Sequence, residues 1–196
     1  MTKQMVGYFG FGSLVNTATL RTDYIETIPV ALKGWRRHWQ GRPAVDDPEI
    51  ALLSIHRYDN AQLHGLIVVD RLENLEMVDE RERGYQRVQL SHDDFLVQGR
   101  DLPVNLPTEL YVYVANPASE PDSQPPLLQS YLDAVMQGYL NEYGSYGLAH
   151  FIETTIGFER SIILDRNEPR YPRAIELDQA SAELFDKTLR GAGVLF

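Results

Sequence analysis

The sequence of 196 residues contains no cysteine. Thiol nucleophiles, thiolate metal sites and disulfide bonds are therefore excluded together, and any chemistry must come from other side chains. Basic residues are in deficit, with 18 Lys and Arg against 28 Asp and Glu, which gives a formal charge of −10 at pH 7. A negative charge of this size opposes approach to nucleic acid and to anionic lipid, so neither is an expected partner.

Long hydrophobic runs are also lacking. No stretch approaches the roughly 18 apolar residues that a membrane-spanning helix needs. Residues 1–6 lack a basic segment followed by a sustained apolar run, which is the pattern of a secretory leader. We therefore expect a cytoplasmic protein that does not bind membranes.

The chain is long enough for one sizeable core. It has 43% hydrophobic residues, and its length does not favour two complete cores. We expect a single domain over residues 1–196, in which residues 150–196 form a C-terminal extension that packs on the rest. Residues 116–126 carry four prolines and should form an exposed connector. No pattern in the sequence indicates an oligomeric state.

Short β-rich runs precede the longest helical pattern in this chain. Strands are predicted at residues 6–11, 27–32, 50–56, 63–69, 85–90 and 110–114. Helices are predicted at residues 71–83, 127–143 and 180–189. In the second helix an i, i+3, i+4, i+7 stripe runs through Leu128, Tyr131, Leu132, Val135, Met136, Tyr139 and Tyr143. This order of elements predicts an α+β fold, a small closed or nearly closed mixed β-barrel or sheet with flanking helices.

One carboxylate of the acidic helix predicted at residues 71–83 falls on the inward face. Asp70 as the N-cap and Gly84 as the stop set the register, and the apolar positions then mark the buried side. Glu82 lies on that side, and so does Asp79, its local competitor for a functional role. The other glutamates of the helix lie on the solvated face: Glu73, Glu76 and Glu80.

Position favours Glu82 over Asp79 as the functional carboxylate. Glu82 lies in the last turn, where the negative end of the helix dipole and partial burial both disfavour a negative charge. A carboxyl in such surroundings suits general acid or base chemistry. The structural alternative is an ion pair with a neighbouring arginine, which would be Arg81, Arg83 or Arg87.

A glycine-spaced turn follows the first predicted strand. Gly10 and Gly12 flank Phe11 just before Ser13. Glycines there allow close approach of a ligand and leave backbone N–H groups for anionic or carbonyl oxygens, although a tight turn with nothing bound has the same spacing. Val15 breaks both the dinucleotide-binding pattern and the nucleophile-elbow pattern, so neither is indicated.

Four blocks of sequence, spread from the first predicted strand to the long helix, match one known family. They are FGFGSL (9–14), GWRRHWQG (34–41), VDERERGYQRV (78–88) and SYLDAVMQGY (130–139). Taken together they resemble the gamma-glutamylcyclotransferase family, especially its ChaC-like branch. The last fifty residues are similar to larger bacterial relatives in a less distinctive way.

The resemblance implies roles for individual residues. The first block is similar to the family's glycine-serine substrate loop, with Phe11 where the family usually has tyrosine. The third block resembles the one that holds the catalytic glutamate, which maps onto Glu82. The fourth resembles the late helix, whose tyrosine lies beside the substrate. The implied substrate-binding residues are Phe11, Gly12, Ser13, Leu14 and Tyr131, with Arg36 and Tyr85 as further candidates.

The family reaction implied by the resemblance is attack by the α-amine of a γ-glutamyl group on its own γ-carbonyl. It releases 5-oxoproline and an amine, and the enzyme would be a carbon–nitrogen lyase. A single carboxylate can act as both base and acid, so no cofactor is expected. No metal is expected either, because the five histidines show no pair at helical ligand spacing.

The expected partner is a small γ-glutamyl molecule, either glutathione, a γ-glutamyl amino acid or a γ-glutamyl amine. The ChaC-like block at residues 34–41 favours glutathione slightly. Two alternatives remain. The chain could be a non-catalytic module that binds a small acidic ligand in the same cavity, or a hydrolase that uses Ser13, which lacks a recognisable base.

Overall fold

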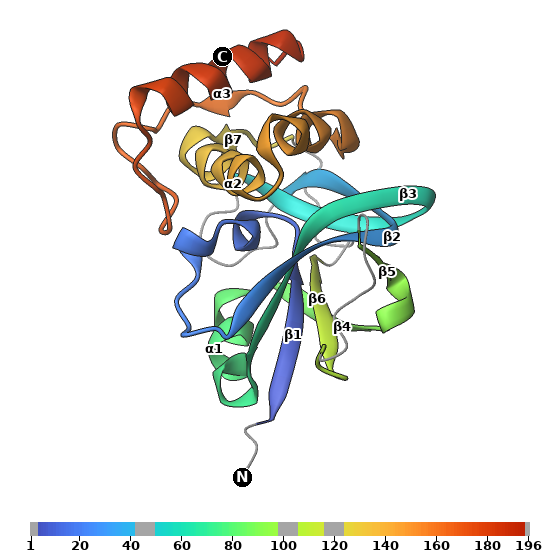
Figure 1. Cartoon of the computed structure of the whole chain (residues 1–196). Coiled ribbons are helices and arrows are strands. Elements are labelled where there is room, and N and C mark those ends of the chain that lie inside the picture. The colour runs from blue at the N-terminus through green and yellow to red at the C-terminus, as the bar shows by residue number, and fades with distance from the viewer. Residues whose placement is uncertain (1–3, 42–49, 98–105, 116–123, 195–196) are drawn as a thin grey trace.

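Two long antiparallel strands run through the centre of the molecule (Figure 1). Strand β2 covers Glu26–Gly41 and strand β3 covers Ala51–Arg71, and the two pair along most of their length. Their buried apolar side chains form a large part of the hydrophobic core. The computed structural model describes residues 4–41, 50–97, 106–115 and 124–194.

Strand β3 joins two strands that the sequence predicted separately, at residues 50–56 and 63–69. The register of β3 against β2 shifts between Lys33 and Trp35. Gly34 and Asn60 adopt positive φ values there, of 72° and 66°. A bulge of this kind twists and bends a ribbon without ending it, which explains why two predicted strands are one curved strand (Figure 1).

The remaining strands extend the sheet beside this ribbon. β1 (Met5–Gly10) pairs antiparallel with β3 and parallel with β6 (Leu110–Ala115), and β6 pairs antiparallel with β4 (Tyr85–Leu90). The strand order is β4-β6-β1-β3-β2-β5. The two-residue strands are β5 (Phe95–Leu96), β7 (Leu127–Leu128), β8 (Thr155–Ile156) and β9 (Ile162–Ile163).

The sheet is mixed and open. Among the described residues the path of paired strands ends at β4 on one side and β5 on the other, and these two strands do not pair. The predicted α+β class with a mixed sheet is confirmed, whereas the closed-barrel form of that prediction is not what the described strands build. Short strands such as β5 offer too few hydrogen bonds to close a barrel.

Helix α2 (Gln129–Thr154) covers one face of the sheet, and α3 (Gln179–Gly191) lies on its outer side (Figure 1). The predicted apolar stripe forms the buried face of α2, so this helix is confirmed. It continues beyond its predicted end, with a break at Gly144, whose φ of 64° suits glycine. Residues 116–123 of the predicted connector lie outside the described residues.

The helix predicted at residues 71–83 is shorter in the structure. β3 runs as far as Arg71, a 3-10 turn covers Leu72–Asn74, and helix α1 covers only Leu75–Arg81. The predicted stop is confirmed, because Gly84 adopts a φ of 93°, a value typical of the residues that end helices. Within the described residues, no helix is both long and apolar enough to span a membrane.

Asp70 is not the N-cap that the sequence indicated. It is a buried residue of β3, and its carboxylate accepts hydrogen bonds from the side chains of Tyr8, Thr22 and Asn74. A buried carboxylate requires such partners. Two of the three lie at least 48 positions away in the sequence, so the helical pattern could not reveal them.

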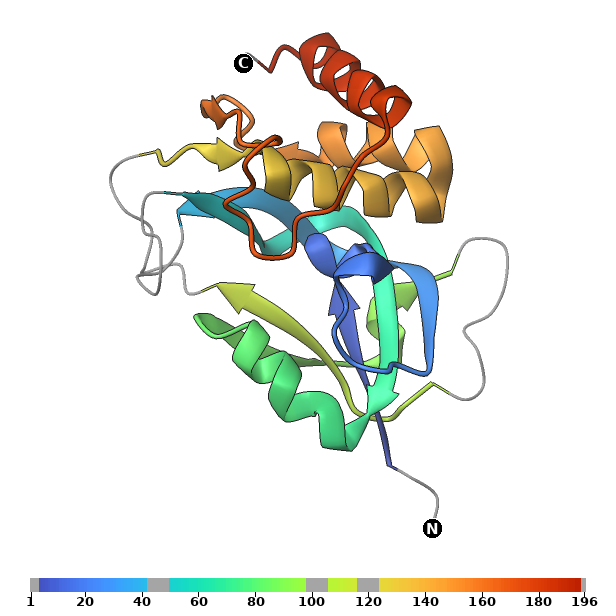
Figure 2. The same ribbon diagram turned by 90° about the vertical axis from the view of Figure 1, so that its left-hand side faces the viewer.

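The segment between β9 and α3, residues 164–178, is called the C-terminal strap below. Figure 2 shows it looping down from the layer of α2 and α3 toward the short turn after β1. Asp165 anchors it to the start of α2, where its carboxylate accepts hydrogen bonds from the backbone N–H (2.8 Å) and the hydroxyl (2.5 Å) of Ser130. Arg166 adds ion pairs to Asp133 of α2 (2.7 Å) and Asp186 of α3 (2.8 Å).

A stack of one buried and two partly buried rings lies between β3 and α2. His64, only 3% exposed, stacks on His150 with ring centroids 4.0 Å apart and on Tyr143 at 5.1 Å. The buried guanidinium of Arg37 donates to the carbonyl oxygen of His64 at 3.3 Å. Burial, reinforced by His150 and Arg37, lowers the pKa of His64 from 6.5 to about 4.

We expect the free energy of unfolding to fall as the pH is lowered from about 6.5 to about 4. In that window His64 binds a proton in the unfolded chain but not in the fold, so protons favour the unfolded state. One such group contributes up to about 1.4 kcal/mol per pH unit. Urea unfolding of the wild type and of His64→Phe across this window tests the effect, since phenylalanine keeps a stacked ring without titrating. Parallel pH profiles for the two proteins would contradict it.

Candidate functional site

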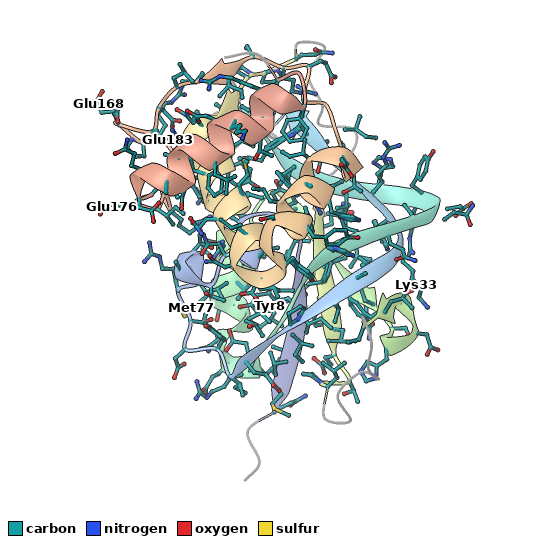
Figure 3. The ribbon with its side chains drawn as sticks, turned by 45° about the horizontal axis from the view of Figure 1, so that its top comes forward. Tyr8, Lys33, Met77, Glu168, Glu176 and Glu183 are labelled. Carbon is teal, nitrogen blue, oxygen red and sulfur yellow. The ribbon has the colours of Figure 1, made fainter. Side chains whose placement is uncertain are left out.

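A cavity of about 670 Å³ lies between α1, the turn after β1 and the C-terminal strap. In Figure 3, Met77 lies on the left and Tyr8 near the centre, and both line this cavity. Lys33, on the right of the same view, belongs to the β2–β3 ribbon and is not among the lining residues. Seven of the residues proposed from the sequence also line this cavity: Phe11, Gly12, Ser13, Leu14, Glu82, Tyr85 and Tyr131.

The turn after β1 is held against helix α2. A 3-10 turn, η1, covers Ser13–Val15 and begins after Gly12. The side chain of Asn16 donates to the carbonyl oxygen of Ala134 in α2 at 2.8 Å. The first N–H groups of a helical turn have no carbonyl partner within the turn, and no side chain caps η1. The N–H groups at its start are therefore available to a ligand in the cavity.

Gly12 makes room for the hydroxyl of Tyr131. A Cβ atom at Gly12 would lie 2.8 Å from Tyr131 Oη, closer than real Cβ contacts. The Tyr131 ring cannot easily retreat, because it is 5% exposed and packs edge-on against Trp39 and Tyr171, with centroids 5.8 Å and 4.9 Å away. The absence of a side chain at Gly12 thus allows the turn to lie close to α2.

Tyr131 remains a neutral phenol. Burial raises its pKa well above the usual value of 10.0, and the negative forms of nearby Tyr85, Tyr171 and Glu82 raise it further. A neutral buried phenol is a hydrogen-bond donor and acceptor in an otherwise apolar wall. Glu82 and Tyr131 line the same cavity.

Glu82 faces the cavity from the end of α1 and is paired with its neighbour in the chain. Arg81 Nε donates to Glu82 Oε1 at 2.9 Å, and the two side chains are 9% and 16% exposed. No other described group forms a hydrogen bond with this carboxylate. Its second oxygen, Oε2, thus accepts no hydrogen bond from the described residues, and the predicted alternative, an ion pair with a neighbouring arginine, is also present.

Arg81 links the end of α1 to the turn after β1. Its guanidinium donates to the carbonyl oxygen and hydroxyl of Thr19, at 2.8 Å and 3.1 Å, and to the hydroxyl of Ser13 at 3.3 Å. Tyr171 of the C-terminal strap donates to the same Ser13 Oγ at 2.7 Å. Three segments distant in sequence therefore meet at Ser13.

The competing carboxylate, Asp79, is engaged elsewhere. It accepts hydrogen bonds from Tyr113 at 2.6 Å and from Arg87 at 2.5 Å. Its side chain is 42% exposed, against 16% for Glu82, so Glu82 is the more sheltered of the two carboxylates. The remaining glutamates of this segment are exposed, as the wheel predicted: Glu73, Glu76 and Glu80.

The structure does not bring the arginine-rich strand to the cavity. Arg36 lies over the ring of Tyr58, 5.1 Å from its centroid, and is not among the described residues that line the cavity. Arg37 points the other way and is buried under Tyr139 and Phe151. Tyr85, the other further candidate, does line the cavity, and its hydroxyl donates to the carbonyl oxygen of Leu53 at 3.1 Å.

Sequence reasoning gave no site role to the C-terminal strap. Tyr171 and Arg173 of the strap line the cavity, as does Arg81 of α1, which was considered only as an ion-pair partner. The signal was weak, because a tyrosine and arginines in a strand-free, helix-free stretch are usually solvated. Within the described residues, no group of three or more His, Asp or Glu side chains is arranged to hold a metal ion.

Comparison with known proteins identifies the fold. No protein-family model matches the chain, and no curated protein matches its sequence. A solved gamma-glutamyl cyclotransferase is similar in structure, with a TM-score of 0.61, 12% identity, and coverage of 94% of this chain and 99% of that one. An uncharacterized protein from Homo sapiens gives a TM-score of 0.60, 13% identity, and coverage of 93% and 99%.

A third solved structure, YkqA from Bacillus subtilis, has a TM-score of 0.55 and 16% identity over 80% of this chain, which spans 57% of that protein. The chain therefore has a gamma-glutamyl cyclotransferase-like fold, and the family resemblance seen in the sequence is confirmed at the level of the fold. At such low identity, the roles of individual residues depend on the geometry of this cavity.

We expect Gly12→Ala to destabilise the protein by about 1 to 3 kcal/mol, because the added methyl group overpacks the contact with Tyr131. Gly191→Ala is the matched control, since a Cβ there meets no atom within 4 Å and alanine favours a helix. Urea unfolding measures both changes. Equal midpoints for wild type and Gly12→Ala would show that Tyr131 can move aside at little cost.

Proposed function

We propose that this protein is a gamma-glutamylcyclotransferase. One observation carries the proposal: in a gamma-glutamyl cyclotransferase-like fold, a single cavity is lined by a sheltered carboxylate, Glu82, and by the glycine turn at residues 11–14. Both features are what the reaction needs, a base for an ammonium group and donors for a carbonyl oxygen or carboxylate.

The proposed reaction takes place within one substrate molecule. The α-amine nitrogen of the γ-glutamyl group forms a bond to the γ-carbonyl carbon, and the bond from that carbon to the leaving nitrogen breaks. The products are 5-oxoproline and an amine. Because both reactants belong to one molecule, holding the substrate in a folded conformation contributes much of the rate.

Glu82 is the proposed acid and base. Its carboxylate removes a proton from the α-ammonium group, which frees the nitrogen lone pair, and later delivers the proton to the leaving nitrogen. The bond from Arg81 Nε to Oε1 fixes the plane of the carboxylate, so that Oε2 is the atom proposed to exchange the proton. No cofactor takes part in this sequence of steps.

The turn at residues 11–14 is the proposed oxygen-binding element. The backbone N–H groups at the start of η1 would stabilise the negative charge that develops on the γ-carbonyl oxygen, or hold the substrate's α-carboxylate. Tyr85, Tyr131 and Phe11 form the aromatic wall that excludes water from the folded substrate. Phe11 adds apolar surface to this wall but has no hydroxyl group. Hydrogen bonds from this wall to the substrate would therefore come from Tyr85 and Tyr131.

The ion pair favours a second candidate function. The presence of a buried carboxylate suggests catalysis most strongly when nothing else explains it, and here Arg81 pairs with Glu82. A non-catalytic module could use the same cavity and the same pair to bind a small acidic ligand. The two candidates differ in a single measurable respect, which is formation of 5-oxoproline.

The first test is a 5-oxoproline assay with glutathione and a panel of γ-glutamyl amino acids and amines. Glu82→Gln should lower the turnover number by about 100- to 10,000-fold, the usual effect of removing a general acid or base. Glu76→Gln is the matched control, an exposed glutamate on the same helix that does not line the cavity. Thermal melting of both variants confirms that they fold.

Each outcome decides between the candidates. Product that is lost in Glu82→Gln and retained in Glu76→Gln supports the cyclotransferase and its acid/base together. Full activity in Glu82→Gln would remove this residue from the mechanism. No product from any substrate, in a protein that still binds γ-glutamyl ligands, would favour the binding module.

A further inference from the structure

The hydroxyl of Ser13 receives hydrogen bonds from two segments that are far apart in the sequence. Tyr171 Oη of the C-terminal strap donates to Ser13 Oγ at 2.7 Å, and Arg81 Nη2 of α1 donates to the same oxygen at 3.3 Å. A serine hydroxyl has two acceptor positions and one proton. Both acceptor positions are therefore occupied, and the hydroxyl can take part in a further hydrogen bond only as a donor.

The Ser13 hydroxyl proton has no acceptor within the described part of the chain. Among these residues, no atom accepts a hydrogen bond from Ser13 Oγ. Ser13 is 9% exposed and lines the cavity, and a sheltered donor that lacks an acceptor is costly. An oxygen atom of a ligand in the cavity would supply the acceptor.

Tyr171 is held in place by its main chain and by its ring. Its backbone N–H donates to Ser130 Oγ, at the start of α2, at 3.3 Å. Its ring packs edge-on against Tyr131, with centroids 4.9 Å apart, and the guanidinium of Arg173 lies 5.6 Å from its centroid. Because Tyr171 is only 7% exposed, these contacts restrict its ring and keep the phenol directed at Ser13.

The two incoming hydrogen bonds also make the Ser13 hydroxyl a better donor. Hydrogen bonds that follow one another in a chain polarise each other, and a charged donor such as the guanidinium of Arg81 forms the stronger kind of bond. Without Tyr171, one acceptor position of Ser13 Oγ would be empty, and the hydroxyl could rotate more freely. Tyr171 therefore affects both the strength and the direction of this donor.

We propose that Tyr171 is a positioning residue, which directs the Ser13 hydroxyl proton into the cavity, where it donates to an oxygen atom of the substrate. Tyr171 acts through Ser13 and not by its own contact with the substrate. The Ser13 hydroxyl then adds one donor to the backbone N–H groups of the same turn. This assignment rests on the proposed cyclotransferase function.

Removal of one hydroxyl group tests the assignment. Tyr171→Phe keeps the ring and should lower kcat/KM for 5-oxoproline formation about 3- to 10-fold, as the loss of one hydrogen bond predicts. In a Ser13→Ala background the same change should lower kcat/KM less than about twofold, because the proton that Tyr171 directs is already absent. Tyr143→Phe is the matched control. It removes a phenol that donates to the carbonyl oxygens of Val30 and Gly65, outside the cavity lining, and should leave kcat/KM unchanged.

A more acidic phenol separates hydrogen-bond donation from packing. A difluorinated tyrosine, with fluorine on both carbons next to the hydroxyl, is placed at position 171 alone. While this phenol is neutral, kcat/KM should match the wild type. Once ionised, it can only accept a hydrogen bond from Ser13, which turns the Ser13 proton away from the cavity. We therefore expect kcat/KM to fall as the pH rises through the pKa of the fluorinated phenol, with no such fall in the wild type or in the fluorinated Ser13→Ala protein.

Three results would overturn the assignment: wild-type kcat/KM in Tyr171→Phe, an undiminished effect of Tyr171→Phe in the Ser13→Ala background, or a fluorinated protein whose pH profile matches the wild type. Circular dichroism at the assay temperature checks that each variant is folded. The proposed function is judged separately, by formation of 5-oxoproline in the wild type. If none forms, the cyclotransferase fails, and the same variants are compared by calorimetric binding of γ-glutamyl ligands. Absence of binding, or equal effects of Tyr171→Phe with and without Ser13, would then also overturn the role of Tyr171.

Discussion

The guanidinium of Arg81 is the interaction on which the candidate site depends. It binds Glu82 at the end of α1 and Ser13 and Thr19 in the turns after β1, so it fixes the carboxylate relative to the glycine turn. Only 9% of its side chain is exposed, and a sheltered pair is little screened by salt. Such a pair adds little to the free energy of unfolding, because desolvation offsets most of the attraction between the two charges. Its main effect is to fix the position of the Glu82 carboxylate.

Fixed geometry is also what the proposed chemistry requires. In a cyclisation within one molecule, the attacking nitrogen and the carbonyl carbon are already tethered. The main task of the protein is therefore to hold these two atoms in a reactive orientation. The packing of Gly12 against the hydroxyl of Tyr131, and of Tyr131 against Trp39 and Tyr171, supplies walls that cannot easily shift. The hydrogen bond from Tyr171 to Ser13 then brings the C-terminal strap into the same rigid unit.

Features that depend on neighbouring residues in the chain were predictable. The apolar stripe of α2, the strand that became β4 and the stop at Gly84 follow from periodicity and from the conformational freedom of glycine. The same periodicity predicted that Glu82 points inward, and in the structure Glu82 lines the cavity from the C-cap position just after α1. The error at Asp70 has the same origin, because an aspartate before a helical pattern resembles a cap whatever its tertiary partners are.

The sequence by itself determined the α+β class, the glycine turn and the position of Glu82 at the end of the acidic helix, since each depends on spacings of a few residues. Tertiary structure alone decided that β3 is one bulged strand, that Arg37 is buried while Arg36 lies away from the cavity, and that the strap lines the cavity. The physical reason is distance along the chain. The hydrogen bond between Tyr171 and Ser13 joins residues 158 positions apart, and no local pattern specifies which surfaces such segments bury together.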